Sequence, residues 1–206
     1  MMMIWKYIKY TISFIILGWI GISCQSDYTK LVKTELAKGI RQDSVFLGIK
    51  LGDTRNEFYG KCFDLNKQHL ISQGEGGSVQ YLFTDSLFHS EPTVIKVLFV
   101  PAFDEKEVIT NMDLKFSYNA WSPLNQGSQI DTLRAKVSDI LMNWYGGNEF
   151  IMFDFDERKL PVKVDGNRRI LVTTFDSQNI VVRVQDLLHP KFKHSIDSGN
   201  AKKESE

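Results

Sequence analysis

The sequence predicts an α+β fold in which helices pack on one face of antiparallel β meanders, in the order ααβββ and then αββββ. Three observations support this prediction. Apolar residues recur at helical spacing in three segments. Several other segments alternate apolar with polar residues, which is the period of a strand. The connections between these alternating segments are short, and short connections favour antiparallel pairing.

The first helix is expected over residues 28–40. Its apolar residues fall on one face at helical spacing, and Gly39 stands where a helix would stop. Those apolar residues are Tyr28, Leu31, Val32, Leu36 and Ile40. Residues 43–51, which follow, are expected to form a brief extended or irregular link.

The second helix has the best-marked start in the chain. Thr54 and Glu57 have the spacing of a capping box, in which each side chain accepts a hydrogen bond from the other residue's backbone N–H. The apolar side of this helix runs to about residue 70 through Phe58, Cys62, Leu65 and His69. Cys62 is expected to pack in the core, because free cysteines are among the most buried residues.

The glycine-rich segment 74–77 breaks the helical period, and a first meander follows. Its three strands are expected over residues 79–83, 94–100 and 112–118. Pro101 is expected to end the middle strand, because proline has no N–H to donate to a neighbouring strand.

A loop rich in turn-forming residues then leads, over residues 121–128, to a third helix. Asp131 is expected to cap this helix and Gly146 to end it. Its apolar face consists of Leu133, Val137, Ile140, Leu141 and Trp144.

Four strands complete the pattern, over residues 150–155, 162–164, 168–175 and 180–184. Asp165-Gly166 is the clearest hairpin signal, because this dipeptide supplies the positive φ angles of a tight turn. One domain is therefore expected over residues 28–190, with two lobes over about 28–120 and 128–190 as the alternative. Residues 191–206 contain few apolar side chains and are expected to form a disordered tail.

The start of the chain has the pattern of a secretory signal peptide over residues 1–23. Lys6 and Lys9 form a basic region, an uncharged and mostly apolar run of 12 residues follows, and Ser23 supplies a small residue before the cleavage site. Cleavage before Cys24 would leave 183 residues, which is enough for one domain with a substantial core.

The segment Gly21-Ile22-Ser23-Cys24 resembles the lipobox of bacterial lipoproteins, although Gly21 stands where the usual lipobox has Leu, Val or Ile. The resemblance implies a lipid anchor on Cys24, which becomes the new N-terminus, and a short tether over residues 24–27. Two or more acyl chains, such as palmitate, give stable anchoring. The alternative is an uncleaved signal anchor, for which the apolar run 7–22 is shorter than the roughly 20 residues that span a bilayer.

Charge and cysteine content exclude two classes of protein. The chain has 25 basic and 25 acidic residues, and removal of the signal peptide with Lys6 and Lys9 leaves a small acidic excess. Since no basic surplus is present to neutralise phosphates, nucleic-acid binding is excluded. Cys24 and Cys62 are the two cysteines, so a disulfide framework is excluded as well.

The sequence contains no motif for catalysis or metal binding. The four histidines lack metal-ligand spacing, and no serine lies in a Gly-x-Ser-x-Gly setting. Asp154 and Asp156 would share one face of a strand end, and paired carboxylates serve acid–base chemistry in some enzymes. A solvated strand end beside Arg158 and Lys159 is the interpretation that we favour. No cofactor and no metal are predicted.

Aromatic residues near the third helix are the candidates for a binding surface, because exposed aromatic residues contribute much of the energy of protein interfaces. These candidates are Tyr118, Trp121 and Tyr145. Trp144 is expected to belong to the core, and a core position is the alternative for Tyr118.

A turn into a capped helix and a following β meander, behind a lipobox-like start, resembles small envelope lipoproteins. On the turn Leu51-Gly52-Asp53-Thr54, the chain is similar over about residues 43–100 to the barrel-assembly lipoprotein family (SmpA/OmlA) and to the β-lactamase-inhibitor-protein fold. The hairpin Asp165-Gly166-Asn167-Arg168-Arg169 resembles envelope lipoproteins of Bacteroidetes type. These resemblances imply an envelope location and a binding or scaffolding role, and they supply no catalytic residues.

We therefore expect a lipid-anchored envelope protein, at the outer membrane or on the periplasmic side, whose domain binds a protein or another envelope component. Two alternatives stay open. One is the same domain on an uncleaved signal anchor. The other is an envelope enzyme with a dispersed carboxylate site around Asp154 and Asp156.

Overall fold

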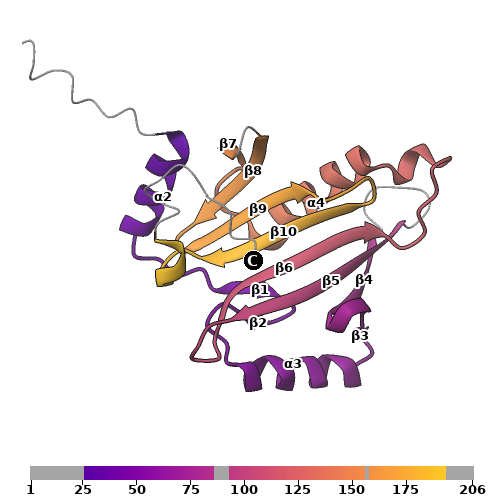
Figure 1. The fold of residues 1–206 in the computed structure, drawn as a ribbon, viewed down its shortest axis with the longest axis horizontal. Coiled ribbons are helices and arrows are strands. Elements are labelled where there is room, and N and C mark those ends of the chain that lie inside the picture. Colours follow the sequence, from indigo (N-terminus) through magenta and orange to yellow (C-terminus); the bar gives the residue numbers. More distant parts are fainter. Residues whose placement is uncertain (1–25, 86–92, 156–157, 194–206) are drawn as a thin grey trace, which may run out of the picture.

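The computed structural model describes residues 26–85, 93–155 and 158–193, and it confirms the α+β class. This part of the chain has three α-helices and ten strands, and eight of the strands form one antiparallel sheet (Figure 1). The predicted signal peptide, Cys24 and the tail from residue 194 lie outside the described residues. Within the described ranges, no helix has the length and apolar character needed to cross a membrane.

Each half of the chain contributes one long helix and four strands to the sheet. The first half contains α2 (Asp27–Ala37), β1 (Ser44–Phe46), β2 (Ile49–Lys50), α3 (Arg55–Lys67), β3 (Ile71–Gln73), β4 (Val79–Asp85), β5 (Thr93–Phe103) and β6 (Ile109–Tyr118). The second half contains α4 (Ile130–Tyr145), β7 (Ile151–Phe155), β8 (Arg158–Asp165), β9 (Arg168–Thr174) and β10 (Asn179–Asp186). The first meander thus has one strand more than predicted, because β3 is too short to show an alternating pattern. The expected irregular link is the β1–β2 hairpin.

The two halves build the sheet with the same internal arrangement. The strand order across the sheet is β3-β4-β5-β6-β10-β9-β8-β7. The strands of the first unit, β3 to β6, run from one edge of the sheet to its middle, and the strands of the second unit, β7 to β10, run in the same order from the other edge. The two units are therefore related by an approximate two-fold axis at the antiparallel β6–β10 pair. Both halves therefore belong to one continuous sheet.

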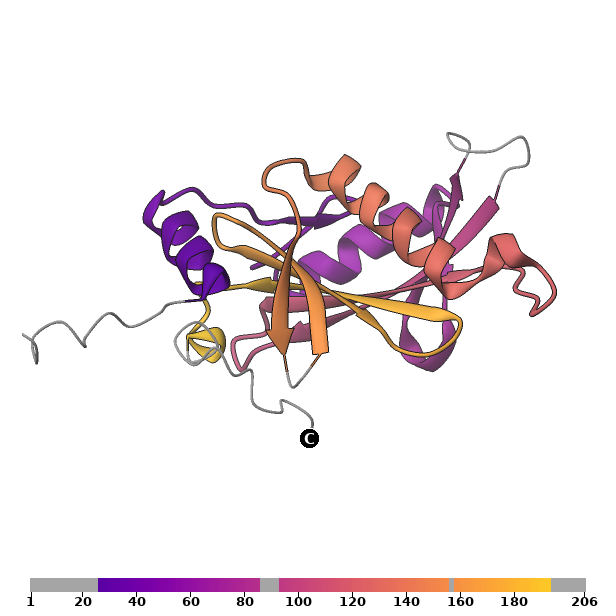
Figure 2. The ribbon, with the colours of Figure 1, turned by 90° about the horizontal axis from the view of Figure 1, so that it is seen from above.

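One face of the sheet carries the main hydrophobic core. Phe99, Leu114, Val182 and Val172 are aligned across four neighbouring strands, and each is at most 2% exposed. α3 and α4 cover this face, as predicted (Figure 2). The core is continuous across both halves, because the aligned row crosses the β6–β10 pair.

The predicted start of α3 is confirmed. Oγ1 of Thr54 accepts a hydrogen bond from the backbone N–H of Glu57 at 3.3 Å, and the Glu57 carboxylate accepts one from the backbone N–H of Thr54 at 2.7 Å. The helix ends at Lys67, before the expected residue 70, and His69 adopts a positive φ of 57°.

α4 begins without the predicted cap. Gln129 occupies the N-cap position and makes no side-chain capping bond, whereas Asp131 lies in the first turn and pairs with Arg134 at 2.8 Å. The Asp131 carboxylate is still favourable there, because it faces the positive end of the helix dipole. Gly146 ends the helix as predicted, with a φ of 56°.

The prediction that the helices share one face of the sheet is wrong for α2, which packs against the opposite face at the β7–β9 end. Tyr28 and Val32 are buried against Phe153 and Val162, whose side chains point away from the main core because residues alternate along a strand. This second, smaller cluster also buries Phe192 from a 3₁₀ turn at Pro190–Phe192. The domain therefore continues past the predicted boundary at residue 190.

Three predicted boundaries shift by a few residues. α2 ends before Ile40, whose side chain is 54% exposed. β5 continues through Pro101, because β4 pairs with β5 only as far as Phe99 and no strand on that side needs an N–H from the proline. In the β8–β9 hairpin the two-residue loop is Gly166-Asn167, and Gly166 has the positive φ of 54°.

Candidate functional site on the open face of the sheet

The aromatic residues predicted to form a binding surface do not gather on one. Tyr118 lies on the core face of β6 and is 5% exposed. The Tyr145 hydroxyl donates a hydrogen bond to the backbone oxygen of Val45, and burial raises the pKa of Tyr145. Trp121 is half-buried just beyond the end of β6. The prediction is therefore corrected for Tyr118 and Tyr145, because strand alternation and helix packing turn both side chains inward.

Trp144 and Cys62 pack against the main core, as predicted. The Trp144 ring lies 4.8 Å from the ring of Phe46, measured between centroids, and it also contacts Phe116. Cys62 is half-buried against the core, and burial raises the pKa of its thiol to about 11. The thiol is therefore protonated at neutral pH and is a poor nucleophile.

The carboxylates predicted as an alternative catalytic pair are not brought together by any described contact. Asp154 is exposed on β7, in register with Lys159 of β8, and Asp156 lies outside the described residues. Within the part of the chain that the structure describes, no three or more His, Cys, Asp and Glu side chains group as a metal site would require.

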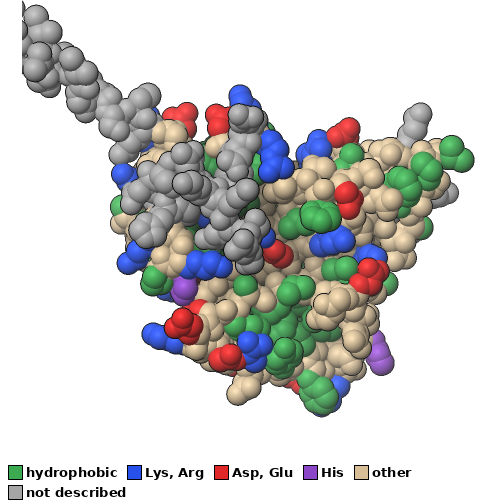
Figure 3. Space-filling view, viewed as in Figure 1, with side chains coloured by type: hydrophobic (Ala, Val, Ile, Leu, Met, Phe, Trp, Pro, Cys, Tyr) green, Lys and Arg blue, Asp and Glu red, His purple; other side chains and the backbone are tan. Residues whose placement is uncertain are grey.

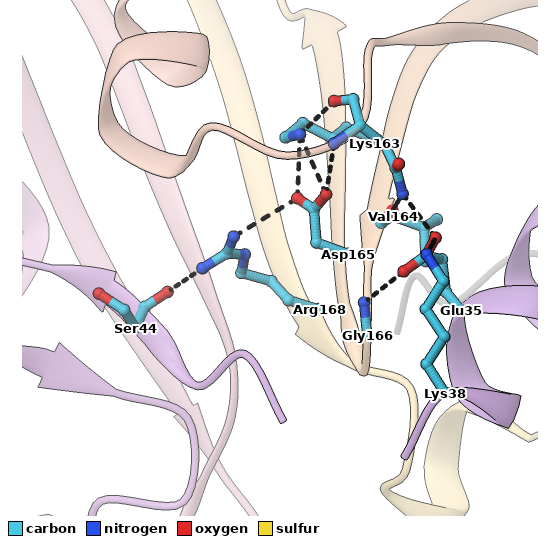
Figure 4. Close-up of polar contacts among 9 residues, drawn as sticks. Glu35, Lys38, Ser44, Lys163, Val164, Asp165, Gly166 and Arg168 are labelled. Atoms are coloured by element: carbon cyan, nitrogen blue, oxygen red, sulfur yellow. Dashed lines mark hydrogen bonds and ion pairs between the residues drawn. The ribbon is translucent and has the colours of Figure 1, made fainter. Parts of the chain in front are cut away.

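The densest polar cluster joins β8, β9 and the loop after α4 (Figure 4). Lys163 is fully buried, and its ammonium group lies 3.0 Å from the Asp165 carboxylate and donates to the backbone oxygen of Asn148. The same carboxylate accepts a hydrogen bond from the Asn148 N–H at 2.8 Å and pairs with Arg168 at 3.4 Å. Arg168 also donates to the backbone oxygen of Ser44 at 3.0 Å.

Glu35 of α2 completes this cluster from the other side (Figure 4). Its carboxylate accepts hydrogen bonds from the Gly166 N–H at 3.1 Å, the Asn148 side-chain amide at 2.7 Å and the Lys38 ammonium at 2.5 Å. Burial alone would raise the pKa of Glu35, but the bonds from Lys38, Gly166 and Asn148 outweigh it and lower the pKa. Since both carboxylates of the cluster are saturated by donors of the protein, the cluster fastens α2 to the hairpin and leaves little capacity for a ligand.

A small cavity of about 200 Å³ lies between α4 and the β7–β9 end of the sheet, next to Arg134, Met152 and Lys159. Small-molecule sites usually enclose ~300–1,000 Å³. Arg134 is already held by Asp131 and by the Thr174 hydroxyl at 3.0 Å. The cavity is therefore a weak candidate for a ligand site.

The most distinctive surface is the sheet face opposite α3 and α4. In β4, β5, β6 and β10 no described helix covers this side, which we call the open face. It includes Gln80, Leu82, Thr84, Lys96, Leu98, Val100, Asp113, Lys115, Ser117, Val181 and Arg183. Figure 3 views the molecule from this side, and hydrophobic side chains gather in the lower half of the view.

Apolar side chains on the open face are unusually exposed for a strand. Leu82 is 46% exposed and Val100 is 48% exposed, while Phe175, in the β9–β10 turn beside the face, is 70% exposed. Leu98 is the exception at 7%, because the turn at Gly74 folds over it. Leu82 is in register with Lys96, and Val100 lies four residues further along β5, so these two exposed side chains share one face of the sheet without touching. A sheet face that exposes apolar side chains and is covered by no described helix is a candidate site for binding a protein.

The charges of the open face are mainly basic. Asp113 and Arg183 form a bidentate pair across β6 and β10, with distances of 2.8 and 2.9 Å. Lys115 lies diagonally beside this pair and 5.7 Å from the centre of the Phe175 ring. Lys96 contacts Glu75 at 3.5 Å, but the Glu75 side chain is 81% exposed, so water weakens this pair. The open face thus offers cations among apolar groups.

Four consecutive apolar residues in β5 indicated this face in the sequence, although the alternation in the neighbouring strands obscured them. Val97-Leu98-Phe99-Val100 is apolar at both strand parities, whereas a strand with one solvated face should alternate. The excess apolar residues at 98 and 100 belong to the open face. Phe175 gave no signal, because it stands at the end of the strand predicted over residues 168–175 and looks like part of that strand.

The comparisons with known proteins add no assignment. No protein-family model, curated protein or solved structure matches the chain. Any functional conclusion therefore rests on the residues and their geometry.

Proposed function

We propose that this protein is a binding module of the cell envelope, which holds a partner protein on its open face and is tethered to the membrane by lipid on Cys24. The observation that carries the binding proposal is the exposure of Leu82 and Val100 around the basic side chains of β5 and β6. A protein partner fits better than a small molecule, because the exposed groups are spread over four strands.

The lipid tether is supported by the lipobox-like residues before Cys24 and by the position of α2. This helix begins at Asp27, so a chain from Cys24 to the helix could reach at most about 10 Å, at ~3.3–3.6 Å per residue. α2 lies on the same side of the sheet as the open face, but it covers that side only at the β7–β9 end. A tethered domain would therefore keep this end near the membrane, and the open face on β4–β6 would remain accessible.

The tether is tested by the intact mass of the protein purified from membranes, with wild type and Cys24→Ala in parallel. The proposal expects a wild-type chain that begins at Cys24 and carries acyl mass, which the variant lacks. A chain that retains residues 1–23 without added mass would instead establish the signal-anchor alternative.

The binding surface is tested by a photo-crosslinking amino acid placed at Val100 in cells. A second position, Asp139, is exposed on α4 and provides the control on the helical side. We expect a discrete crosslinked partner from Val100 that is absent from Asp139 and is lost when Lys115→Glu reverses a charge of the face. Equal products from both positions, or products insensitive to Lys115→Glu, would count against the open face as the binding site.

A further inference from the structure

The outward side of α3 carries two exposed aromatic side chains. Tyr59 is 57% exposed and Phe63 is 61% exposed, whereas Phe58 faces the core and is 2% exposed. The Lys67 ammonium lies 4.2 Å from the centre of the Phe63 ring, so the end of the exposed side is both apolar and positively charged. None of these outward side chains belongs to the main core.

Gly60 lies between the two aromatic residues and has no role inside the molecule that requires a glycine. It is exposed, its φ is not positive, and a Cβ atom there would meet nothing within 4 Å. Glycine in the middle of a helix is less stable than alanine. An open glycine beside exposed rings is the arrangement that permits another backbone or a large side chain to approach closely.

Four residues of α3 form one outward stripe, which we call the α3 stripe: Asn56, Gly60, Phe63 and Lys67. Their spacing of four, three and four residues is that of a seam between two helices. The stripe contains both a protruding ring, at Phe63, and a hollow, at Gly60. A single helix therefore carries both halves of a complementary contact.

We propose that the α3 stripe pairs antiparallel with the α3 stripe of a second copy of this chain. A two-fold axis midway between Gly60 and Phe63 places each Phe63 ring over the Gly60 of the other copy. The same axis places each Lys67 beside the other copy's Asn56. Such a contact is isologous, because both copies use the same surface and each residue pair therefore occurs twice, once on either side of the axis.

The charges along α3 favour a second copy in this orientation. The Glu57 carboxylate lies next to Asn56, and hydrogen bonds from the backbone and side chain of Thr54 lower the pKa of Glu57, so it is charged at neutral pH. Antiparallel pairing brings Lys67 of one copy to this acidic end of the other. Parallel pairing would instead oppose Lys67 to Lys67 and leave both Gly60 hollows facing each other.

The contact is expected to be weak in solution. One helical seam buries less than the ~1,200–2,000 Å² of a stable protein interface, so dimerisation should depend on concentration. The inference does not need the proposed function, although tethering to a membrane would raise the effective concentration of the copies.

The test is sedimentation equilibrium of the full chain in a density-matched detergent over a wide concentration range. We expect the wild type to approach dimer mass. Phe63→Ala removes the ring, Gly60→Leu fills the hollow, and each should weaken association by about tenfold or more. Leu124→Ala is the matched control, because Leu124 is 92% exposed on a distant loop and should not matter.

A second measurement separates loss of contact from loss of fold. Asn56→Cys with Lys67→Cys should form a disulfide-linked dimer under mild oxidation, whereas Asn56→Cys alone should not, because the two-fold axis keeps the two copies of residue 56 apart. A wild-type chain that stays monomeric throughout, or one whose association is unchanged by Phe63→Ala and Gly60→Leu, overturns the proposal. Equal crosslinking of the double and single cysteine variants overturns it as well.

Discussion

Lys163 shows how a buried charge in this protein depends on a single carboxylate. Its side chain has no exposed surface, and Asp165 is its ionic partner at 3.0 Å. We expect Asp165→Ala to lower the free energy of unfolding by about 3–5 kcal/mol, because it leaves a buried ammonium group without a counter-ion. Urea unfolding of the two proteins measures this difference.

The control for that prediction removes both charges. Lys163→Met combined with Asp165→Ala should recover part of the lost stability, because no buried ammonium remains and an apolar chain of similar length fills the space. A double variant as unstable as Asp165→Ala alone would mean that the carboxylate acts mainly through Asn148 and Arg168.

Sequence patterns correctly predict that the Val182 side chain is buried, but they do not predict the burial of Lys163. Alternation along a strand assigns Val182 to the core, and the structure agrees. A lysine between two valines looks solvent-facing by its type, yet Lys163 is buried because the loop after α4 brings the Asn148 carbonyl over it. That contact joins residues from separate elements, and no local pattern encodes it.

Glu35 makes stability depend on acid pH. Since its pKa is lowered in the folded state, the folded chain binds this proton less readily than the unfolded chain, whose glutamate has a pKa of ~4.3. The stabilisation is therefore complete above that value and is lost as the pH falls through the lowered folded pKa. We expect Glu35→Gln to destabilise the protein by about 1–3 kcal/mol at neutral pH and by less in acid.

Denaturant unfolding of wild type and Glu35→Gln from neutral to acid pH measures this difference. The gap between the two proteins should narrow as the pH falls. A gap that stays constant across the range would show that the charge of Glu35 contributes nothing and that only its shape matters.

At the scale of the element, α3 has a built-in weakness at Gly60. Because a Cβ atom would meet nothing within 4 Å there, Gly60→Ala should raise the free energy of unfolding by about 0.5–1 kcal/mol. Gly166→Ala is the contrasting variant, because its Cβ would lie 2.2 Å from the backbone oxygen of Ile40 and its φ is positive. Thermal unfolding should move in opposite directions for the two variants, and a loss of stability with Gly60→Ala would mean that its surroundings are closer than the structure shows.

The helices themselves are predictable from the sequence, but the face on which each packs is not. The capping box at Thr54 and the apolar spacing of α4 fix where two helices form, because these signals lie within one or two turns. For α2, helical spacing identifies Tyr28 and Val32 as buried, yet both faces of a sheet can supply apolar partners. The choice is made by Phe153 and Val162, far along the chain.

At the scale of the whole molecule, the repeated unit explains both the covered and the open faces. The approximate two-fold axis at β6–β10 is perpendicular to the sheet, so it keeps α3 and α4 on the same side. On the face opposite α3 and α4, α2 packs only at the β7–β9 end, so no described helix covers β4–β6 there. The open face is therefore a consequence of the symmetry, and single-sequence patterns, which show no residue-level repeat, could not predict it.

One shared sheet also predicts how the molecule unfolds. Phe99, in the first half, is fully buried and aligned through Leu114 with Val182 and Val172 of the second half. Phe99→Ala should destabilise the chain by about 3–5 kcal/mol, because it leaves a cavity in a core common to both halves. Hydrogen exchange should then accelerate in β8 and β9 as much as in β4 and β5, since opening one half exposes the core of the other.

Mass-spectrometric hydrogen exchange of wild type, Phe99→Ala and Leu124→Ala distinguishes this behaviour from that of two independent lobes. In two lobes, Phe99→Ala would accelerate exchange only in β3–β6 and leave the strands after α4 at their wild-type rates. Leu124→Ala should change neither half, because its side chain is 92% exposed. Because β6 and β10 pair over their whole common length, from Asn111 with Gln185 to Ser117 with Asn179, we expect the strands of both halves to open together.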